Sequence, residues 1–576
     1  MQSVIWKIGG EAGFGIMSAG NMLARVFSRQ GYHIFATNEY PSLIRGGHNL
    51  ITLRVGCVTF ESMNRGVNVL VALNKETVSL HKDELSCGSL VVFDPNNYNW
   101  NATELPKDVI LTPVPLTELL TKAGGVPVMR NTVALGASLA LLGADFSHLE
   151  TMITEQFKRK GDAVVSLNIA VARSGYDYVR NTYPKETSVF LDKPKSSDKL
   201  LVMNGSEAFG VASVRAGLKF AAIYPMTPIN SLISFLADHE KQLSIVYMQP
   251  EDEIAGINMA LGASLMGVRS MVATSGGGFA LMVEGVSLAG MMELPVVIDL
   301  GMRVGPATGM PTWTEQGELQ FVIHAGHGEF ARIVLAPADA EQTYSLVIAA
   351  FNLADKYHIP VFVLTDKYLN ESQWAVRRTV MEKDVPIDRG KLLLGKELTQ
   401  DPPYKRYALD TEDGVSARAV PGQKNGFFIS NSYEHDEIGM VTEDPSMRRE
   451  MVQKRLKKFK AISLDIEGPS VYGDTEADLT LVCWGTTRGP VIDAMELLRA
   501  KGKKVRVIHY FWMYPFPSDE TKKLLSSGGK IVDIEQNSTG QLAELIAEHC
   551  QIAVTEKLLK YDGRPFYPEE IVELLS

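Results

Sequence analysis

Short apolar runs alternate with longer amphipathic runs along most of this 576-residue chain. Residues 4–8, 49–55, 331–335, 359–364 and 479–484 are compact apolar segments of strand length, and most are followed by residues with helical apolar spacing. Gly, Pro, Ser and Thr gather where the predicted strands end. This alternation is typical of parallel sheets covered by helices, with functional loops at the carboxyl edge. We therefore expect an α/β chain of several doubly wound domains.

Changes in this pattern divide the chain into five predicted segments. The stretch 186–199 (ETSVFLDKPKSSDK) is rich in charge and has little apolar periodicity, as is typical of a linker. An α/β segment precedes it, residues 1–185, and another follows it, residues 200–375. Residues 376–470 contain few apolar runs and many charges, and the α/β pattern returns over residues 471–576. A chain of this length exceeds what one hydrophobic core supports.

The composition excludes some classes of protein. The hydrophobic content of 45% and the charged content of 22% are those of ordinary globular proteins. A net charge of −10 argues against non-specific nucleic-acid binding. There is no run of eighteen apolar residues and no signal-peptide pattern at the start, so we expect neither a membrane span nor export, and hence a cytoplasmic protein.

The four cysteines are too scattered for a metal centre within this chain, and none forms a C-x-x-C pair. They are most simply buried thiols in a reducing compartment. The run Glu434-His435-Asp436-Glu437 also lacks ligand spacing and is expected to be a solvated turn. We therefore expect no metal site in this chain. The cysteines are Cys57, Cys87, Cys483 and Cys550.

The segment 224–228 (YPMTP) links an apolar strand to an amphipathic helix. Pro228 suits a first helical turn, where its missing N–H costs nothing. Thr227 would then present its hydroxyl to a ligand at the helix N-terminus.

Three acidic residues, Glu251, Asp252 and Glu253, begin the next predicted helix. Carboxylates at a helix start complement the helix dipole, and this feature alone needs no further explanation. Among the three, Glu251 suits helix capping.

The order of motifs around these acids resembles one family. YP-x-TP is followed by Glu253 nine residues before Gly262, then by TSGGG at 274–278, ELP at 293–295 and R-x-G-P-x-T-G-x-P at 303–311. Together they resemble the pyrimidine-binding domain of the 2-oxoacid:ferredoxin oxidoreductases, which use thiamine diphosphate. Met226 stands where isoleucine is commoner in the family, a volume-conserving difference.

The resemblance implies roles for particular residues. Glu253 would be the catalytic carboxylate, hydrogen-bonded to the aminopyrimidine ring of the cofactor. Thr227 and Arg303 would bind the substrate, although Arg303 could equally serve an interdomain ion pair. The residues expected to border the cofactor are Tyr224, Pro225, Ser275, Gly276, Gly277, Thr308 and Gly309.

Two glycine-rich loops near the N-terminus raise the question of nucleotide binding. The run 9–15 (GGEAGFG) does not fit G-x-G-x-x-G, and Glu11 has the wrong charge for phosphate, so a tight βα turn is favoured. In the loop 39–48, Arg45 beside two glycines suits a phosphate or a plain surface turn. Together the loops resemble the family's gamma subunit, fused ahead of the alpha part. On that basis Arg45 is a candidate contact for coenzyme A.

Two later segments complete the interpretation. Residues 447–459 (MRREMVQKRLKKF) predict a basic amphipathic helix for a surface or a subunit contact. Residues 471–576 resemble the transketolase C-terminal-like domain, which positions subunits in this family.

The chain lacks the parts that a complete enzyme of this family requires. No Gly-Asp-Gly sequence, the family's diphosphate clamp, occurs in it. The resemblance therefore implies a beta subunit that holds the diphosphate, its Mg²⁺ and a [4Fe-4S] cluster, in an (alpha–beta)₂ assembly that reduces ferredoxin. The implied reaction is the reversible oxidative decarboxylation of a 2-oxoacid, with coenzyme A as cosubstrate, to acyl-CoA and CO₂.

The gamma–alpha fusion favours 2-oxoglutarate as the substrate. A broad-specificity, pyruvate or branched-chain 2-oxoacid enzyme remains an alternative, as does a subunit of a non-redox thiamine enzyme. A third alternative is a non-catalytic regulatory subunit.

Overall fold

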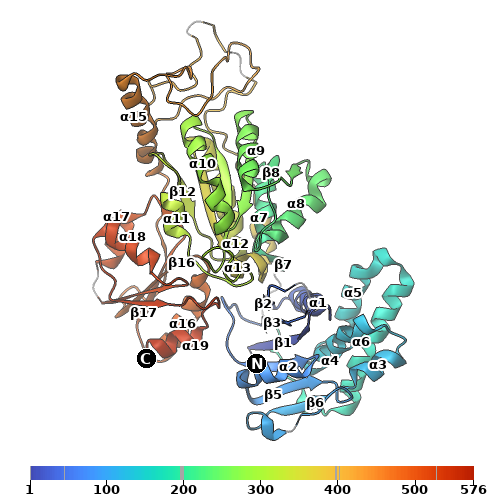
Figure 1. Cartoon of the computed structure of the whole chain (residues 1–576). Coiled ribbons are helices and arrows are strands. Elements are labelled where there is room, and N and C mark those ends of the chain that lie inside the picture. Colours follow the sequence, from blue (N-terminus) through green and yellow to red (C-terminus); the bar gives the residue numbers. More distant parts are fainter. Residues whose placement is uncertain are drawn as a thin grey trace. The chain divides into compact units, whose positions relative to one another are not determined.

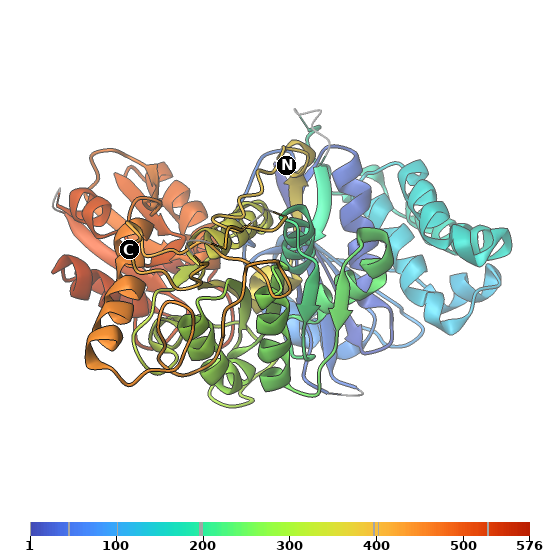
Figure 2. The same ribbon diagram turned by 90° about the horizontal axis from the view of Figure 1, so that it is seen from above.

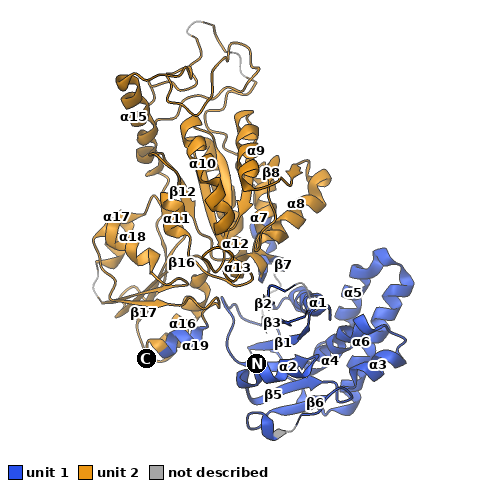
Figure 3. Ribbon diagram, in the orientation of Figure 1, with its two compact units in different colours: residues 1–203, 372–381, 567–573 blue, residues 204–371, 382–566, 574–576 orange. Residues whose placement is uncertain are grey.

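The computed structural model describes residues 2–43, 46–100, 102–194, 200–395, 398–400, 403–526 and 529–576. These residues form two compact units (Figure 3). Unit 1 comprises Met1–Met203, Ser372–Met381 and Tyr567–Glu573, and unit 2 comprises Asn204–Glu371, Glu382–Phe566 and Leu574–Ser576. Arg45 and residues 195–199 of the predicted linker 186–199 lie outside the described residues. The multi-domain α/β architecture predicted from the sequence is confirmed.

Unit 1 contains one sheet of eight strands in the order β6-β5-β4-β1-β3-β2-β14-β7. Strands β1, β4, β5 and β6 are parallel, whereas β3 runs antiparallel between β1 and β2. Its strands are β1 (Ser3–Glu11), β2 (His33–Glu39), β3 (His48–Gly56), β4 (Val67–Ala72), β5 (Leu85–Phe93), β6 (Ile110–Pro113), β7 (Leu200–Asn204) and β14 (Gln373–Arg377). Its helices are α1 (Ile16–Arg29), α2 (Lys75–His81), α3 (Leu116–Lys122), α4 (Arg130–Leu141), α5 (Phe146–Phe157), α6 (Asp162–Thr182), α14 (Arg378–Met381) and α19 (Pro568–Leu574).

The first glycine-rich run ends a strand and begins a turn. Strand β1 continues through Gly9 and Gly10, and only then does the chain turn into α1. Gly13 and Gly15 have φ angles of 91° and 69°, a conformation that side chains disfavour. The run is therefore the tight βα turn that the sequence favoured.

The central sheet of unit 2 has the strand order β18-β12-β13-β11-β10-β8-β9, and β18 alone pairs antiparallel. Its strands are β8 (Phe220–Ala222), β9 (Val246–Met248), β10 (Ser270–Thr274), β11 (Val296–Met302), β12 (Ile333–Leu335), β13 (Pro360–Asp366) and β18 (Trp512–Tyr514). The helices of this part are α7 (Gly205–Arg215), α8 (Asn230–Leu243), α9 (Glu253–Leu265), α10 (Gly276–Met292), α11 (Leu319–His324), α12 (Ala340–Tyr357) and α13 (Lys367–Glu371). Figure 1 shows α9 and α10, in green, side by side along the sheet.

A smaller sheet follows near the C-terminus, in the order β15-β17-β16-β19-β20. It forms a lobe of its own within unit 2, coloured orange to red in Figures 1 and 2. Strand β18 leaves this region and adds to the central sheet through Val334 and Tyr514, so the two sheets share a core. The elements are β15 (Ser470–Gly473), β16 (Leu479–Trp484), β17 (Val505–Tyr510), β19 (Lys530–Glu535), β20 (Glu556–Leu559), α16 (Arg488–Ala500), α17 (Ser518–Leu525) and α18 (Gln541–Cys550).

Three further observations bear on the sequence predictions. Within the described part of the chain, no helix has the length and apolar character to cross a membrane. All four cysteines are free. No group of three or more His, Cys, Asp or Glu side chains among the described residues is arranged to hold a metal ion.

The segment after unit 2's central sheet is held by buried charges. Between Met381 and Pro445 the described residues form no helix and only isolated β-bridges. Helix α15 (Pro445–Ile462) follows, and its Lys454, Arg455 and Lys458 are buried. The predicted basic helix is present and exposed on one side, but three of its basic side chains pack inward against acidic partners; the subunit contact stays a prediction.

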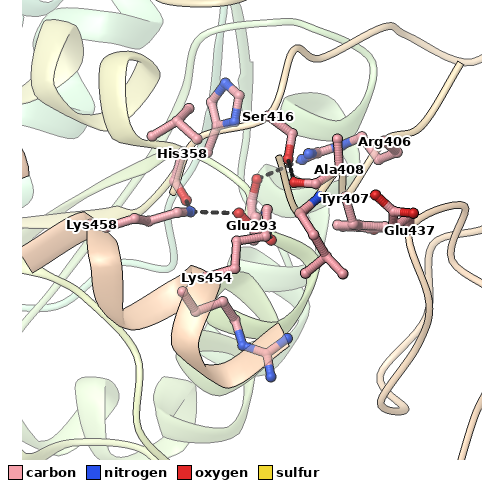
Figure 4. A network of polar contacts seen from close by, with 12 residues as sticks. Glu293, His358, Arg406, Tyr407, Ala408, Ser416, Glu437, Lys454 and Lys458 are labelled. Atoms are coloured by element: carbon pink, nitrogen blue, oxygen red, sulfur yellow. Dashed lines mark hydrogen bonds and ion pairs between the residues drawn. The ribbon is translucent and has the colours of Figure 1, made fainter. Parts of the chain in front are cut away.

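Glu293 is the carboxylate that receives two of these lysines (Figure 4). It ends α10, and its side chain is fully buried. Lys454 Nζ lies 2.5 Å from its Oε1 and Lys458 Nζ lies 2.7 Å from its Oε2. Burial alone would raise the pKa of Glu293, but Lys454, Lys458 and Arg406 together lower it well below its usual range. Glu293 is thus a buried ion held charged by cations of the connecting segment and α15.

A second carboxylate, Asp355 of α12, anchors the same region. Its Oδ2 accepts hydrogen bonds from Nε of Arg269 at 2.8 Å and Nε of Arg389 at 2.7 Å. Arg418 Nη2 lies 3.3 Å from the other oxygen. Because Arg389 and Arg418 belong to the irregular segment, the segment is fastened by charge in place of regular secondary structure.

The run Glu434-His435-Asp436-Glu437 belongs to this anchorage and is not a solvated turn. Arg455 Nη2 donates to Glu434 Oε2 at 2.8 Å, and Arg448 also contacts this carboxylate. His435 is buried, with its ring 4.0 Å from that of Tyr407. The prediction failed because the basic partners lie on α15, later in the chain.

Candidate active site at the carboxyl edge of the central sheet

Four adjacent parallel strands bring the predicted site residues to one edge of the central sheet. In the order β11-β10-β8-β9, the loops after the strands contain Arg303, Ser275, Thr227 and Glu253 respectively. Carboxyl ends of parallel strands meet at one edge, and ligands of α/β sheets bind there. The strand order therefore brings site residues that are spread over positions 224 to 303 to one edge of the sheet.

Glu253 is the first residue of α9 and is only 3% exposed. Its Oε1 is buried and has no hydrogen-bond partner among the described residues. A buried polar atom without a partner is costly, and such atoms are commonly satisfied by a bound ligand or water. This oxygen is therefore the strongest indication of a ligand in the site.

The cap of α9 is Asp252, and the prediction for Glu251 is wrong. Asp252 has extended backbone, and its Oδ1 accepts a hydrogen bond from Ala255 N at 2.8 Å. The helix begins one residue later than the capping assignment required, so Glu251 lies outside it and is exposed. Glu253 is consequently the acid that points inward.

The glycine run at the start of α10 fits the acids around it. A Cβ on Gly278 would overlap both Glu253 Oε1 and Thr274 Oγ1. A Cβ on Gly276 would overlap Glu318 Oε1, with Cδ of the same side chain 3.1 Å away. A Cβ on Gly277 would meet nothing within 4 Å. A side chain at Gly276 or Gly278 would therefore collide with a carboxyl group that lies against it, whereas Gly277 has room for one.

Ser275 caps the N-terminus of α10 and is fully buried. Its hydroxyl lies 2.5 Å from the sulfur of Met226, and Thr274 Oγ1 lies 4.0 Å from the same sulfur. A thioether can accept these weak hydrogen bonds and isoleucine cannot. The Met226 side chain therefore links the YPMTP segment to the glycine turn at the start of α10, a contact that isoleucine would not make.

Thr227 and Arg303 are in direct contact. Arg303 Nη1 donates to the carbonyl oxygen of Thr227 at 2.8 Å. Burial lowers the pKa of Arg303, and nearby Glu318 opposes the change. Arg303 forms no ion pair within 4.0 Å among the described residues. Its remaining N–H groups are thus available for a carboxylate.

The start of α8 differs from the prediction. Thr227 and Pro228 form a turn, with Ile229 N donating to Met226 O at 3.0 Å, and α8 begins only at Asn230. Thr227 is therefore three residues from the helix, held by Arg303.

The remaining predicted cofactor residues lie on exposed loops of the same edge. Tyr224 and Pro225 follow β8 and are exposed. Thr308 and Gly309 lie in a loop closed by the bridge between Val304 and Met310. The described contacts do not join Thr308 or Gly309 to Glu253.

Glu318 is a site residue that the sequence did not reveal. Its Oε2 is buried without a hydrogen-bond partner among the described residues. Burial, together with repulsion from Glu315, raises the pKa of Glu318 to about 8, and Arg303 opposes the change only in part. No local signal distinguishes it, because its partner Gly276 lies far back in the chain.

The C-terminal part of unit 2 holds the loop that carries Glu318. Gln316 is fully buried; its Nε2 donates to Trp484 O at 3.0 Å, and its Oε1 accepts from Thr487 at 2.6 Å. Gln541 Nε2 donates to Gly317 O at 2.8 Å. The loop is therefore fixed on both sides of Gly317.

Three family models match the chain in succession. Residues 5–178 match "Pyruvate ferredoxin/flavodoxin oxidoreductase". Residues 211–469 match "Pyruvate flavodoxin/ferredoxin oxidoreductase, thiamine diP-bdg", and residues 477–571 match "Pyruvate:ferredoxin oxidoreductase core domain II". The fold and these matches define a chain of the thiamine-dependent oxidoreductase class.

Comparison with relatives of nearly equal length identifies the family within this class. The 2-oxoacid:ferredoxin oxidoreductase 2, subunit alpha, of Aeropyrum pernix is 34% identical over 98% of this chain and 96% of its own. The subunit KorA of the 2-oxoglutarate oxidoreductase of Mycobacterium tuberculosis is 27% identical over 99% and 91%. The solved 2-oxoglutarate:ferredoxin oxidoreductase from Magnetococcus marinus, with 2-oxoglutarate, coenzyme A and succinyl-CoA bound, has 32% identity and a TM-score of 0.92 over 100% of this chain and 99% of that one. The chain therefore belongs to the 2-oxoacid:ferredoxin oxidoreductase family, as an alpha subunit.

Proposed function

We propose that this chain supplies the pyrimidine-facing acid and the substrate-carboxylate site of a thiamine-diphosphate-dependent enzyme that oxidises 2-oxoglutarate. In the proposed reaction, 2-oxoglutarate and coenzyme A give succinyl-CoA and CO₂, and two electrons pass to ferredoxin. The observation that carries the proposal is the buried, unpartnered Oε1 of Glu253 at the carboxyl edge of the sheet.

The residues present fit the aminopyrimidine end of thiamine diphosphate. Glu253 offers an oxygen that needs a partner, and the glycine turn leaves room beside it, since Gly277 faces open space. When bound, the cofactor supplies the carbanion chemistry that allows the bond between the carboxylate and the 2-oxo carbon to break. Glu253 would hold a proton at the pyrimidine nitrogen, which requires a carboxyl group within hydrogen-bond reach.

The substrate end is assigned to Arg303 and Thr227. The guanidinium of Arg303 is fixed by its hydrogen bond to Thr227 O, and its other N–H groups suit the carboxylate that all 2-oxoacids share. Exposed Tyr224 and Thr308 would border the entrance. Arg45 remains the proposed contact for coenzyme A.

The missing parts are assigned to a partner. The sequence has no Gly-Asp-Gly, and its four free cysteines are scattered. We therefore infer a beta subunit that holds the diphosphate, Mg²⁺ and a [4Fe-4S] cluster, in an (alpha–beta)₂ assembly. The relatives named as alpha subunits support such a partner.

The substrate assignment rests on relatives with different printed names. The Magnetococcus marinus structure contains 2-oxoglutarate, and several relatives are named 2-oxoglutarate enzymes. Three relatives that match nearly the whole chain at 32–34% identity are named 2-oxoacid enzymes, so broad specificity is the second candidate.

The test is to purify the chain alone and together with the beta subunit. We expect the chain alone to be inactive and to bind thiamine diphosphate weakly, and the complex to reduce ferredoxin with 2-oxoglutarate. Comparing kcat/KM for 2-oxoglutarate, pyruvate and 2-oxoisovalerate then decides the substrate. A preference for pyruvate would overturn the 2-oxoglutarate assignment, and activity of the isolated chain would overturn the need for a partner.

A further inference from the structure

We propose that Glu318 is a substrate-positioning residue whose neutral carboxyl group donates a hydrogen bond to the carboxylate of the bound 2-oxoacid, beside Arg303. This inference rests on the proposed function and adds a second contact to the substrate end of the site. It differs from the assignment of Glu253, which concerns the cofactor.

The position of Glu318 is the first argument. Its carboxyl group lies against Gly276 at the N-terminus of α10, where a Cβ would overlap it. Arg303 follows the neighbouring strand β11, and the two side chains are near enough for each to shift the pKa of the other. The carboxyl group therefore lies between the glycine turn and the arginine proposed to bind substrate. Its Oε2 has no hydrogen-bond partner among the described residues, so it can reach a ligand.

The second argument concerns its protonation. Two charged groups shift the pKa of Glu318: Glu315 of the same loop and Arg303, just after β11. Gln541, which packs beside the loop, is neutral. Burial and Glu315 raise the pKa of Glu318 by more than the backbone N–H of Gly317, Arg303 and its own backbone N–H lower it. The resulting pKa of about 8 leaves the group protonated at neutral pH. A protonated carboxyl group is a hydrogen-bond donor, whereas an ionised one would repel an anion.

The third argument is that Arg303 and Glu318 are not paired with each other. The two side chains form no ion pair within 4.0 Å among the described residues, and Arg303 instead donates to Thr227 O. A carboxylate placed beside both would receive one charged and one neutral donor. An approaching anion also favours the protonated form of Glu318, so substrate binding and protonation reinforce each other.

The fourth argument is rigidity. Gln316 is bonded to Trp484 O and Thr487, and Gly317 O accepts from Gln541. The residue after these two fixed neighbours has a defined backbone position. Positioning of a substrate requires such support from surrounding residues.

The experiment uses the assembled complex and an unreactive substrate analogue. The dissociation constant of N-oxalylglycine, or of oxamate if pyruvate is the substrate, is measured between pH 6.5 and 9.5 by calorimetry in two buffers of different ionisation enthalpy. In the wild type we expect affinity to fall about tenfold per pH unit above pH 8, with uptake of about one proton on binding at pH 9.

Two variants of Glu318 sharpen the result. Glu318→Gln keeps a neutral donor, so we expect affinity within about threefold of wild type at pH 7 and no decline between pH 8 and 9.5. Glu318→Ala should bind about tenfold or more weakly at all pH values, because the donor is lost. Glu315→Gln removes the repulsion that favours protonation, so the decline in affinity should begin at lower pH.

The outcomes separate this inference from the proposed function. Coinciding wild-type and Glu318→Gln pH profiles in an active complex, or no proton uptake by the wild type, would overturn the role of Glu318 alone. Absence of turnover with every 2-oxoacid would overturn the proposed function itself. The wild-type proton uptake decides the matter even if a variant does not assemble.

Discussion

Unit 2 contains two pairs of buried carboxylates with opposite surroundings. Glu293 forms ion pairs with two lysines of α15. Asp355 forms ion pairs with Arg269, just before β10, and with two arginines of the connecting segment. Among the described residues Glu253 and Glu318 form no ion pair within 4.0 Å, and each has a buried oxygen with no hydrogen-bond partner. The pKa of Glu293 is lowered well below its usual range, and that of Glu318 is raised to about 8.

The difference supports our proposals that Glu253 and Glu318 serve a ligand, whereas Glu293 and Asp355 hold the fold. Burying a carboxylate is tolerated when cations and hydrogen bonds surround it, as they do at Glu293. An incompletely paired buried acid weakens the fold and persists where function requires it. On these proposals, the four acids distinguish an anchored region of unit 2 from the candidate active site.

The largest effect is expected from Glu253→Gln. The variant should keep its fold and its partner but lose turnover by about 10²–10⁴-fold, because a positioned proton-transfer group is removed. Turnover is measured on the assembled complex as ferredoxin reduction, with cofactor binding measured separately. Glu251→Gln is the matched control, since Glu251 is exposed. An active Glu253→Gln beside an inactive Glu251→Gln would assign the role to Glu251.

Removing the charge of Glu293 should cost about 3–5 kcal/mol of stability, because Glu293→Gln leaves Lys454 and Lys458 buried without a counter-charge. The measurement is native-state hydrogen exchange of α10 and α15, supported by denaturant unfolding. Glu496→Gln serves as the control, since the pair of Glu496 with Arg499 is exposed and is worth at most about 1 kcal/mol. Equal exchange in the two variants would refute the anchoring role.

The glycine turn offers a smaller and sharper test. Gly278→Ala forces a Cβ onto Glu253 and Thr274, so we expect a loss of about 1–3 kcal/mol in the free energy of unfolding. Gly277→Ala has open space at the same helix end and should be neutral or slightly stabilising. Denaturant unfolding of both variants compares them. A destabilised Gly277→Ala beside an unchanged Gly278→Ala would contradict the packing described for this turn.

The two acids should also give opposite dependence of stability on pH. Glu293 has a lowered folded pKa, so its stabilisation is present above its unfolded pKa of about 4.3 and is lost as pH falls. Glu318 has a raised folded pKa, so the folded state keeps its proton between about pH 4.3 and 8. Stability should then fall with rising pH by up to about 1.4 kcal/mol per unit across that window.

Denaturant unfolding at each pH unit from 3 to 8 measures these slopes. Glu318→Gln should flatten the decline between pH 5 and 8, whereas Glu293→Gln should flatten only the loss below about pH 4.5. An unchanged slope in Glu318→Gln would mean that Glu318 is ionised in the folded chain.

The sequence predicted the strands and helices well where periodicity was strong. The predicted strand 359–364 is β13 (Pro360–Asp366), and the predicted strand 479–484 is β16 (Leu479–Trp484). Glu253 was chosen over Glu251 from motif spacing, and the structure places Glu253 inside. Local pattern suffices when the partners of a residue lie on its own element or on neighbouring strands.

Interactions between segments far apart in the chain could not be predicted from the sequence. The basic residues of α15 were expected to face outward, because nothing local shows that Glu293 lies about 160 residues earlier. Glu318 was missed for the same reason, since the glycine that accommodates it is on another loop. Charge and burial of this kind depend on tertiary packing, which periodicity does not encode.

The three residues Gln316, Gly317 and Glu318 carry a further consequence for how this family can change in length. Gln316 points into the C-terminal lobe and Glu318 toward the glycine turn, so the single residue between them sets the distance between two packed surfaces. An insertion or deletion there would detach one side or the other. In an alignment of homologues, gaps should therefore be absent from this three-residue spacing.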